Sequence, residues 1–273
     1  MWKKRLIVRS SIVKLSIMLI VLAVTSCEKV IQVDIDEAPN QLVIEGVITE
    51  GRVTQVVKLS RSVPVTETSS FPAVQGAAVK VTDSFNNSFI LTETQPGTYT
   101  TTFRGRIDRT YSLTVQTEGR IYTARSKMPD SVMIDSLSIK EFTFGGDVSK
   151  QVQVHYRDPL FDTNYYRFVL FINGKQANSI FAENDRFNDG NFVKSLLFHD
   201  DDTDGALKSG DTVTVIMQCI DPFVFTYWYS LTQQSMRGPG GGTAPGNPPS
   251  NISNGALGYF SAQTQSSMSL KIE

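Results

Sequence analysis

From residue 41 onward, apolar and polar residues alternate with a period of two over many short segments. This period predicts half-buried strands, because successive side chains of a strand point to opposite faces of a sheet. Thr and Val dominate these segments, as is typical of pleated sheets. The alternation therefore predicts a mainly all-β protein, built as sandwiches of short strands. The clearest strand segments of the first half are 42–48, 53–59, 77–81, 98–103 and 111–115.

A proline divides the strand-rich sequence into two regions. Pro129 ends the last strand of the first pattern, and a second strand-rich region begins at Val132. We therefore predict two β-sandwich-like domains, an N-terminal sandwich at 41–129 and a C-terminal β-rich domain at 130–273.

The second region carries its own strand and hairpin signals. Val152, Val154 and Tyr156 share one face of a strand, which leaves His155 on the solvent side. The apolar run 165–172 ends at Asn-Gly, the strongest short hairpin signal. A later strand contains Cys219, which we expect to be a buried, inert thiol.

One short helix is predicted in the second domain, at about 222–237. Asp221 is an N-cap, Pro222 occupies the first helical position, and a Gly/Pro-rich loop at 238–250 follows. The helix is rich in aromatic residues, which pack onto a sheet or form a surface that contacts a ligand or partner. The residues that would make this contact are Tyr227, Trp228 and Tyr229.

The first 26 residues have the composition of an export signal. Five basic residues precede an apolar run at 15–24, and small residues precede Cys27. The apolar run is about half of the ~20 residues that a spanning helix needs, so cleavage is favoured over a retained anchor or an ordinary secretory signal. The order resembles a bacterial lipoprotein signal, which implies diacylglycerol on the sulfur of Cys27. Residues 27–40 would then be the tether.

Charge and cysteine content exclude further classes. Removal of residues 1–26 leaves 247 residues with 21 basic and 27 acidic side chains. This acidic balance argues against a nucleic-acid partner, which requires a basic footprint. With Cys27 acylated, Cys219 has no partner, so no disulfide is expected within the chain.

The segment 199–211 has partial calcium-loop spacing. Asp200, Asp202, Asp204 and Gly205 fit the first, third, fifth and sixth positions of a twelve-residue loop, and Asp211 fits the twelfth. In such a loop alternate carboxylates surround one hard cation. The flanks, however, read as strands, and an acidic, solvated connection between strands is the alternative. A bound calcium would be structural.

No enzymatic motif is present in the sequence. It contains no Gly-x-Ser-x-Gly elbow and no His-Glu-x-x-His, and its two histidines cannot supply a three-histidine zinc site. A Ser-His-Asp arrangement around His199 stays open, because such groups assemble in space rather than in sequence. We expect a protein that is not an enzyme.

Two family resemblances follow from these motifs. Segment 75–119, with Gly76-Ala77-Ala78-Val79-Lys80-Val81 and Gly97-Thr98-Tyr99, resembles a carboxypeptidase-regulatory or transthyretin-like sandwich. The signal, the helix after Asp221 and the closing Asn251-Ile252-Ser253-Asn254-Gly255-Ala256-Leu257-Gly258-Tyr259-Phe260 segment resemble domain-of-unknown-function family 4249. This resemblance implies a lipoprotein of the Bacteroidetes outer membrane that accompanies TonB-dependent transporters.

Two non-enzymatic functions fit this sequence. In the first, the lipid-anchored protein is an accessory of a transporter barrel and captures a ligand or docks on the barrel. In the second, it is a structural or adhesive envelope module without a transporter partner, with no pocket or sizeable apolar patch.

Overall fold

The alternating segments form strands, as predicted, and the protein is mainly β. The structure is a computed structural model that describes residues 40–64, 71–144, 147–235 and 246–273. Residues 38–273 form one compact unit. The strands before Pro129 are β1 Leu42–Thr49, β2 Gly51–Arg61, β3 Ala78–Asp83, β4 Ser88–Gln95, β5 Thr98–Gly105, β6 Thr110–Thr117 and β7 Arg120–Lys127.

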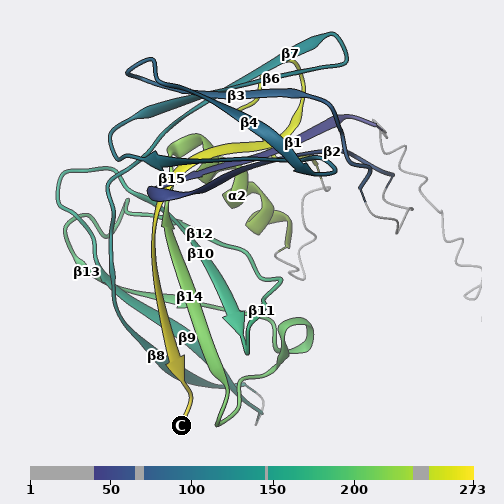
Figure 1. Ribbon diagram of the computed structural model, residues 1–273. Helices are drawn as coiled ribbons and strands as arrows, with labels where there is room; N and C mark the ends of the chain where they lie inside the picture. The colour runs from purple at the N-terminus through teal and green to yellow at the C-terminus, as the bar shows by residue number, and fades with distance from the viewer. Residues whose placement is uncertain (1–39, 65–70, 145–146, 236–245) are drawn as a thin grey trace, which may run out of the picture. The chain divides into compact units, whose positions relative to one another are not determined.

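The remaining elements follow Pro129 (Figure 1). The expected helix, α2, spans Pro222–Ser235, and a single π-helical turn, η1, spans Asp201–Gly205. The strands are β8 Ile134–Phe144, β9 Asp147–Arg157, β10 Tyr165–Ile172, β11 Lys175–Gln176, β12 Phe181–Asn184, β13 Phe192–Leu197, β14 Thr212–Cys219 and β15 Leu257–Lys271.

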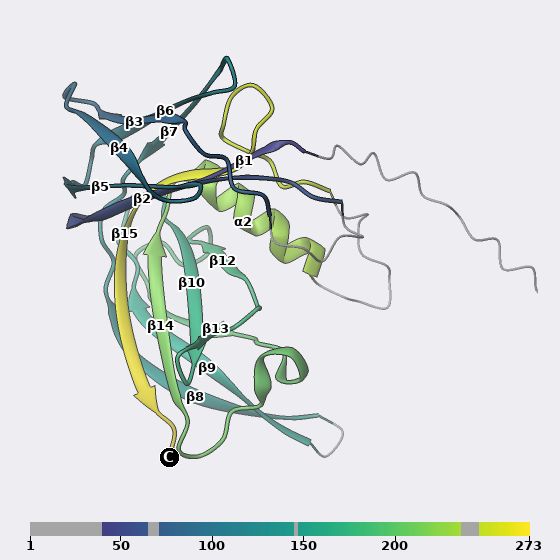
Figure 2. The same cartoon turned by 45° about the vertical axis from the view of Figure 1, so that its right-hand side comes forward.

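Most strands belong to one continuous sheet. Its order is β11-β10-β14-β15-β1-β2-β5-β4-β3-β6-β7, and β12 pairs with β10. A second sheet of order β13-β9-β8 packs against the β10-β14-β15 part of the large sheet. Figure 2 shows β3, β6 and β7 above the layer of β1, β2 and β5, so the large sheet folds over itself.

The last strand, β15, connects the two halves of the structure. Its first part runs parallel to β1, from Leu257 opposite Val43 to Gln263 opposite Thr49. Its second part, 264–271, runs antiparallel to β14. In Figure 1 β15 passes from the upper layers down to the C-terminus. One strand thus supplies main-chain hydrogen bonds to both halves.

The structure has two main hydrophobic cores, one built mainly from residues before Pro129 and one mainly from residues after it. The first contains buried residues from 42–128, and the second contains buried residues from 132–219. The end of the chain contributes to both, with Phe260 in the first core and Ile272 in the second. A division at Pro129 therefore separates the two cores, whereas β15 belongs to both.

Local sequence chemistry explains the turns that connect these strands. Asn173 and Gly174, between β10 and β11, both have positive φ, at 50° and 80°. A two-residue hairpin of this kind requires that conformation, which Asn and Gly tolerate best. The predicted hairpin is therefore present, but the returning strand β11 has only two residues, because β10 next pairs with β12.

Candidate functional site

Helix α2 packs against β10, β12 and β15. Asp221 caps its N-terminus, as its Oδ1 accepts hydrogen bonds from the amides of Phe223 at 2.9 Å and Val224 at 3.1 Å. Val224 is buried against Ile220 and Tyr259. The cap and this small cluster fix the rotation of the helix, and with it the side chains that the helix turns toward β10.

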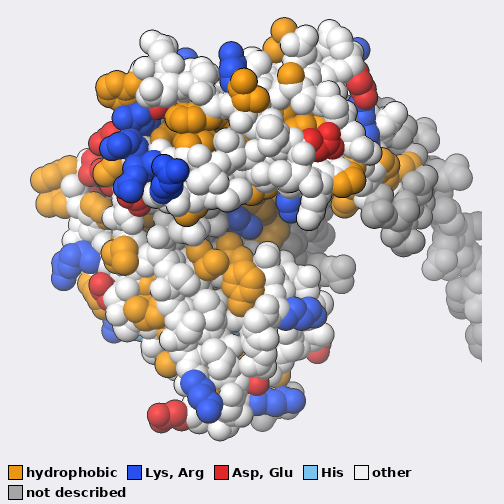
Figure 3. Space-filling model, in the orientation of Figure 1, with side chains coloured by type: hydrophobic (Ala, Val, Ile, Leu, Met, Phe, Trp, Pro, Cys, Tyr) orange, Lys and Arg blue, Asp and Glu red, His pale blue; other side chains and the backbone are white. Residues whose placement is uncertain are grey.

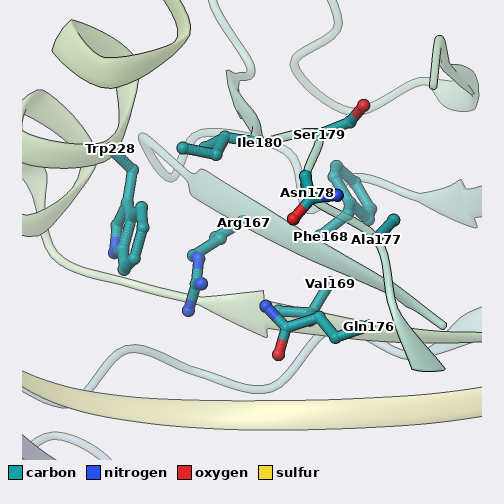
Figure 4. A pocket seen from close by; sticks show the side chains of 9 residues that line it. All are labelled: Arg167, Phe168, Val169, Gln176, Ala177, Asn178, Ser179, Ile180 and Trp228. Carbon is teal, nitrogen blue, oxygen red and sulfur yellow. The ribbon is translucent and has the colours of Figure 1, made fainter. Parts of the chain in front are cut away.

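The central feature of this region is a pocket of about 350 Å³ between α2, β10 and the loop 177–180. This volume lies at the small end of the roughly 300–1,000 Å³ typical of ligand sites. Figure 4 shows the side chains around it. The lining residues are Arg167, Phe168, Val169, Gln176, Ala177, Asn178, Ser179, Ile180 and Trp228.

Strand alternation places a cation in this pocket. Tyr166 and Phe168 of β10 point into the second core, so Arg167 between them points to the opposite face, toward α2. Its guanidinium carbon lies 3.5 Å from the centre of the Trp228 ring, a cation–π contact. Its Nη1 donates a hydrogen bond of 3.0 Å to Oε1 of Gln218 on β14. Burial lowers the pKa of the Arg167 guanidinium, which nevertheless stays protonated at neutral pH.

The loop 177–180 forms one wall of the pocket, and Asp204 holds it in place. Oδ1 of Asp204 accepts hydrogen bonds from the backbone and side-chain nitrogens of Asn178, at 2.6 and 3.0 Å. Its Oδ2 accepts a 2.6 Å hydrogen bond from the Ser179 hydroxyl. Burial alone would raise the pKa of Asp204, but these hydrogen bonds outweigh it and lower the pKa. The carboxylate therefore acts as a brace for the pocket wall.

The structure separates the three helix aromatics that the sequence analysis grouped. Tyr227 and Trp228 pack on Tyr259 of β15, with ring centres 5.0 and 5.2 Å apart from it. Tyr229 is 45% exposed and stacks on Phe225. Trp228 alone of the three lines the pocket. The aromatic helix thus serves partly as packing and partly as a pocket wall.

The predicted calcium ligands do not converge on one point in this structure. Among the residues that the structure describes, no three of Asp200, Asp202, Asp204 and Asp211 have ligand atoms within 4.8 Å of one another. Asp211 instead accepts a 2.9 Å hydrogen bond from the side chain of Asn173. The local spacing fits a calcium loop, but Asp204 bonds to Asn178 and Ser179, whereas Asp211 bonds to Asn173.

A different set of carboxylates is close together, and no local sequence pattern indicates it. Oxygens of Asp158, Asp185 and Asp189 lie within 4.8 Å of one another. Burial raises the pKa of Asp158, which accepts a hydrogen bond from the Tyr166 hydroxyl. Asp189 accepts one from the amide of Phe161. The first bond joins the loop after β9 to β10, and the second joins that loop to the loop after β12.

Both histidines lie away from the pocket. Nε2 of His199 lies 3.2 Å from Oδ1 of Asp201, and its ring is buried. Nε2 of His155 lies 2.7 Å from the hydroxyl of Ser138, on the half-exposed face of β8 and β9. Cys219 is a buried free thiol, as expected, and Cys27 lies outside the described residues.

Basic side chains gather at one end of the first sandwich, near the end of β5 and the start of β2 (Figure 3). Arg104, Arg106 and Arg109 line a hollow there of about 440 Å³. Glu50 and Asp108 line the same hollow, and Arg109 is paired with Asp83. The surface is therefore mixed in charge.

Fold and site together define a mainly β protein with a ligand-sized pocket between its helix and its central sheet. The family model described as "Domain of unknown function (DUF4249)" matches residues 28–269, and the chain belongs to this family. A two-domain fibronectin type-III segment of chicken tenascin is similar at 11% identity, covering 66% of this chain and 90% of that segment, with a TM-score of 0.21. Among curated proteins there is no significant match. Within the described residues, no helix has the length and apolarity to cross a membrane.

Proposed function

We propose that this protein is a lipid-anchored, non-catalytic envelope protein that captures a small ligand for an outer-membrane transporter. The pocket between Arg167 and Trp228 is the observation that carries this proposal. It offers an aromatic ring, a cation and the amides of Gln176 and Asn178 within one concave surface. Ligand sites commonly combine an apolar wall with a few polar groups in this way.

The anchor rests on the sequence before the first strand. Cys27 follows a segment with the composition of an export signal, and the first strand that the structure describes begins at Leu42. Each buried methylene of an acyl chain contributes about 0.8 kcal/mol, so two or more chains give stable anchoring. The tether 27–40 would then join the β body to the bilayer. Resemblance to lipoproteins of the Bacteroidetes favours the outer membrane.

The proposal also names a partner, the barrel of an outer-membrane transporter. A companion of a TonB-dependent barrel needs a surface that holds a ligand, whereas a structural or adhesive spacer module needs no pocket. The half-buried Arg167 beside Trp228 favours the first of these functions. The second function remains the alternative.

A pull-down from cells tests this function. The chain, tagged at its C-terminus, is extracted in a mild detergent after brief cross-linking, and the co-purifying proteins are identified by mass spectrometry. We expect the barrel of a TonB-dependent transporter in stoichiometric amount. Cys27→Ser is the matched control and should lose it, because the body no longer resides at the bilayer. Repeated recovery of the protein without a barrel would favour the spacer module.

A further inference from the structure

Arg167 has more hydrogen-bond donors than the described part of the chain uses. A guanidinium carries five N–H donors in a planar fork. One of them bonds to Gln218, and the described residues provide no other hydrogen-bond acceptor. No carboxylate of the described chain lies within 4.0 Å of a guanidinium nitrogen. Most donors of this side chain are therefore left for another acceptor.

The surroundings of Arg167 do not neutralise its charge. The Trp228 ring covers one face of the guanidinium, which removes water from that face but accepts no N–H bond. The groups that favour the charged form are Tyr259, Tyr227 and then Glu45 on β1. The tyrosines are uncharged at neutral pH, and Glu45 forms no ion pair with Arg167 among the described residues. Burial of a cation without an anion is costly, so this arrangement favours an anionic partner.

The pocket rim offers further polar groups in the same space. In Figure 4 the Gln176 amide and the Arg167 guanidinium point into one hollow, and the Asn178 side chain borders it. Gln176 makes no side-chain hydrogen bond within the described chain. A planar guanidinium with a free edge matches the two oxygens of a carboxylate or phosphate.

We infer that the Arg167 pocket binds the oxyanion group, carboxylate or phosphate, of a small ligand. This inference rests on the proposed ligand-capture function and names the chemical class of the ligand. Arg167 binds the oxyanion, and the Trp228 ring orients the Arg167 guanidinium by packing against its face. Gln176 binds those oxygen atoms of the oxyanion that Arg167 does not contact. The wall at 177–180, braced by Asp204, sets the size of the group that enters.

The chain contains its own reporter for this binding. Its two tryptophans are Trp2 and Trp228, so a full chain with Trp2→Phe has one indole, in contact with Arg167. The probes are acetate, its neutral isostere acetamide, and inorganic phosphate, added at constant ionic strength. The readouts are Trp228 fluorescence and the NMR signal of the Arg167 Nε–H group, assigned by its loss in Arg167→Gln.

We expect saturable responses to acetate or phosphate in both readouts, with acetamide binding at least about tenfold more weakly. Acetate above phosphate would assign a carboxylate ligand, and the reverse order a phosphate ligand. Arg167→Gln should weaken the binding of the preferred anion by about tenfold or more. Arg157→Gln, which removes an exposed arginine of β9, is the matched control and should leave it unchanged.

Three results would overturn the inference. They are equal responses to acetate and acetamide, an unchanged anion titration in a folded Arg167→Gln variant, and no response to either anion in either readout. The titration needs no partner, so its outcome is independent of the transporter pull-down. If a barrel co-purifies but the protein binds neither anion, only the proposed ligand class is refuted.

Discussion

Removal of the Asp221 carboxylate should destabilise the whole protein, because this buried side chain joins three elements. Asp221 caps α2 through the amides of Phe223 and Val224. It also accepts a hydrogen bond from the hydroxyl of Ser126 on β7. Ser126 in turn accepts a 2.8 Å hydrogen bond from the amide of Ala262 on β15. The cap thus connects the pocket helix to β7 and β15.

The magnitude follows from the bonds that Asp221→Ala removes. Loss of an N-cap costs about 1 kcal/mol, within a range of about 0.5–2 kcal/mol. The Ser126 hydroxyl, which is buried, would also lose its acceptor, at a cost of about 1–3 kcal/mol. Together these give a loss of about 2–4 kcal/mol in the free energy of unfolding. Asp221→Asn keeps an oxygen for the cap and should cost about 1 kcal/mol.

Urea unfolding of the two variants, followed by far-ultraviolet circular dichroism, measures these differences. The parent, Asp221→Asn and Asp221→Ala should unfold in that order of decreasing midpoint, with similar dependence on urea. A loss below about 0.5 kcal/mol in Asp221→Ala would refute the role of this carboxylate as a junction. So would an equal loss in both variants, because the oxygen would then be irrelevant.

Three further predictions test separate parts of the structure. Gly46→Ala places a Cβ 2.7 Å from the buried ring of Phe260 and should cost about 1–3 kcal/mol in urea unfolding, whereas Gly246→Ala, with open space around it, should be neutral. The pKa of Asp204 lies below its ordinary 3.8, so its contribution to the free energy of unfolding is present above that pH and is lost as the pH falls through the folded-state pKa. Asp204→Asn should therefore reduce the loss of stability at acid pH, and an unchanged acid dependence would contradict the role of Asp204 in holding the pocket wall. Cys27→Ser should leave the membrane fraction on cell fractionation, and firm retention there would count against the anchor.

The alternation in the sequence predicts the strands that have an apolar inner face, but it does not predict β15, the strand that joins the two halves of the structure. The early strands of the first sandwich alternate cleanly, and α2 begins at Pro222 as its cap predicts. Strand β15 was missed because its buried positions include Ser261, Thr264 and Ser266. Ser266 accepts a hydrogen bond from the amide of Ile134 across the second core. Where buried positions hold polar residues that make such hydrogen bonds, the alternation of apolar and polar residues is no longer visible in the sequence.

The pocket was only partly predictable for a related reason. Trp228 stands out as an aromatic residue on a helix, but Arg167 lies within the apolar run of β10, and the sequence analysis does not single it out. A single charged residue inside such a run is the signal that could have indicated it. The calcium-loop spacing does not indicate the hydrogen bonds of Asp204, because they depend on a loop about 25 residues away in sequence, which no local pattern reveals.

The central claim, a β body held at a bilayer by a lipid on Cys27, has one direct test. The protein is purified from its membrane in detergent, and its N-terminal peptide is measured by intact mass. We predict a chain that begins at Cys27 and carries the added mass of diacylglycerol. An unmodified sulfur at that position, or a chain that still carries residues 1–26, would contradict the claim.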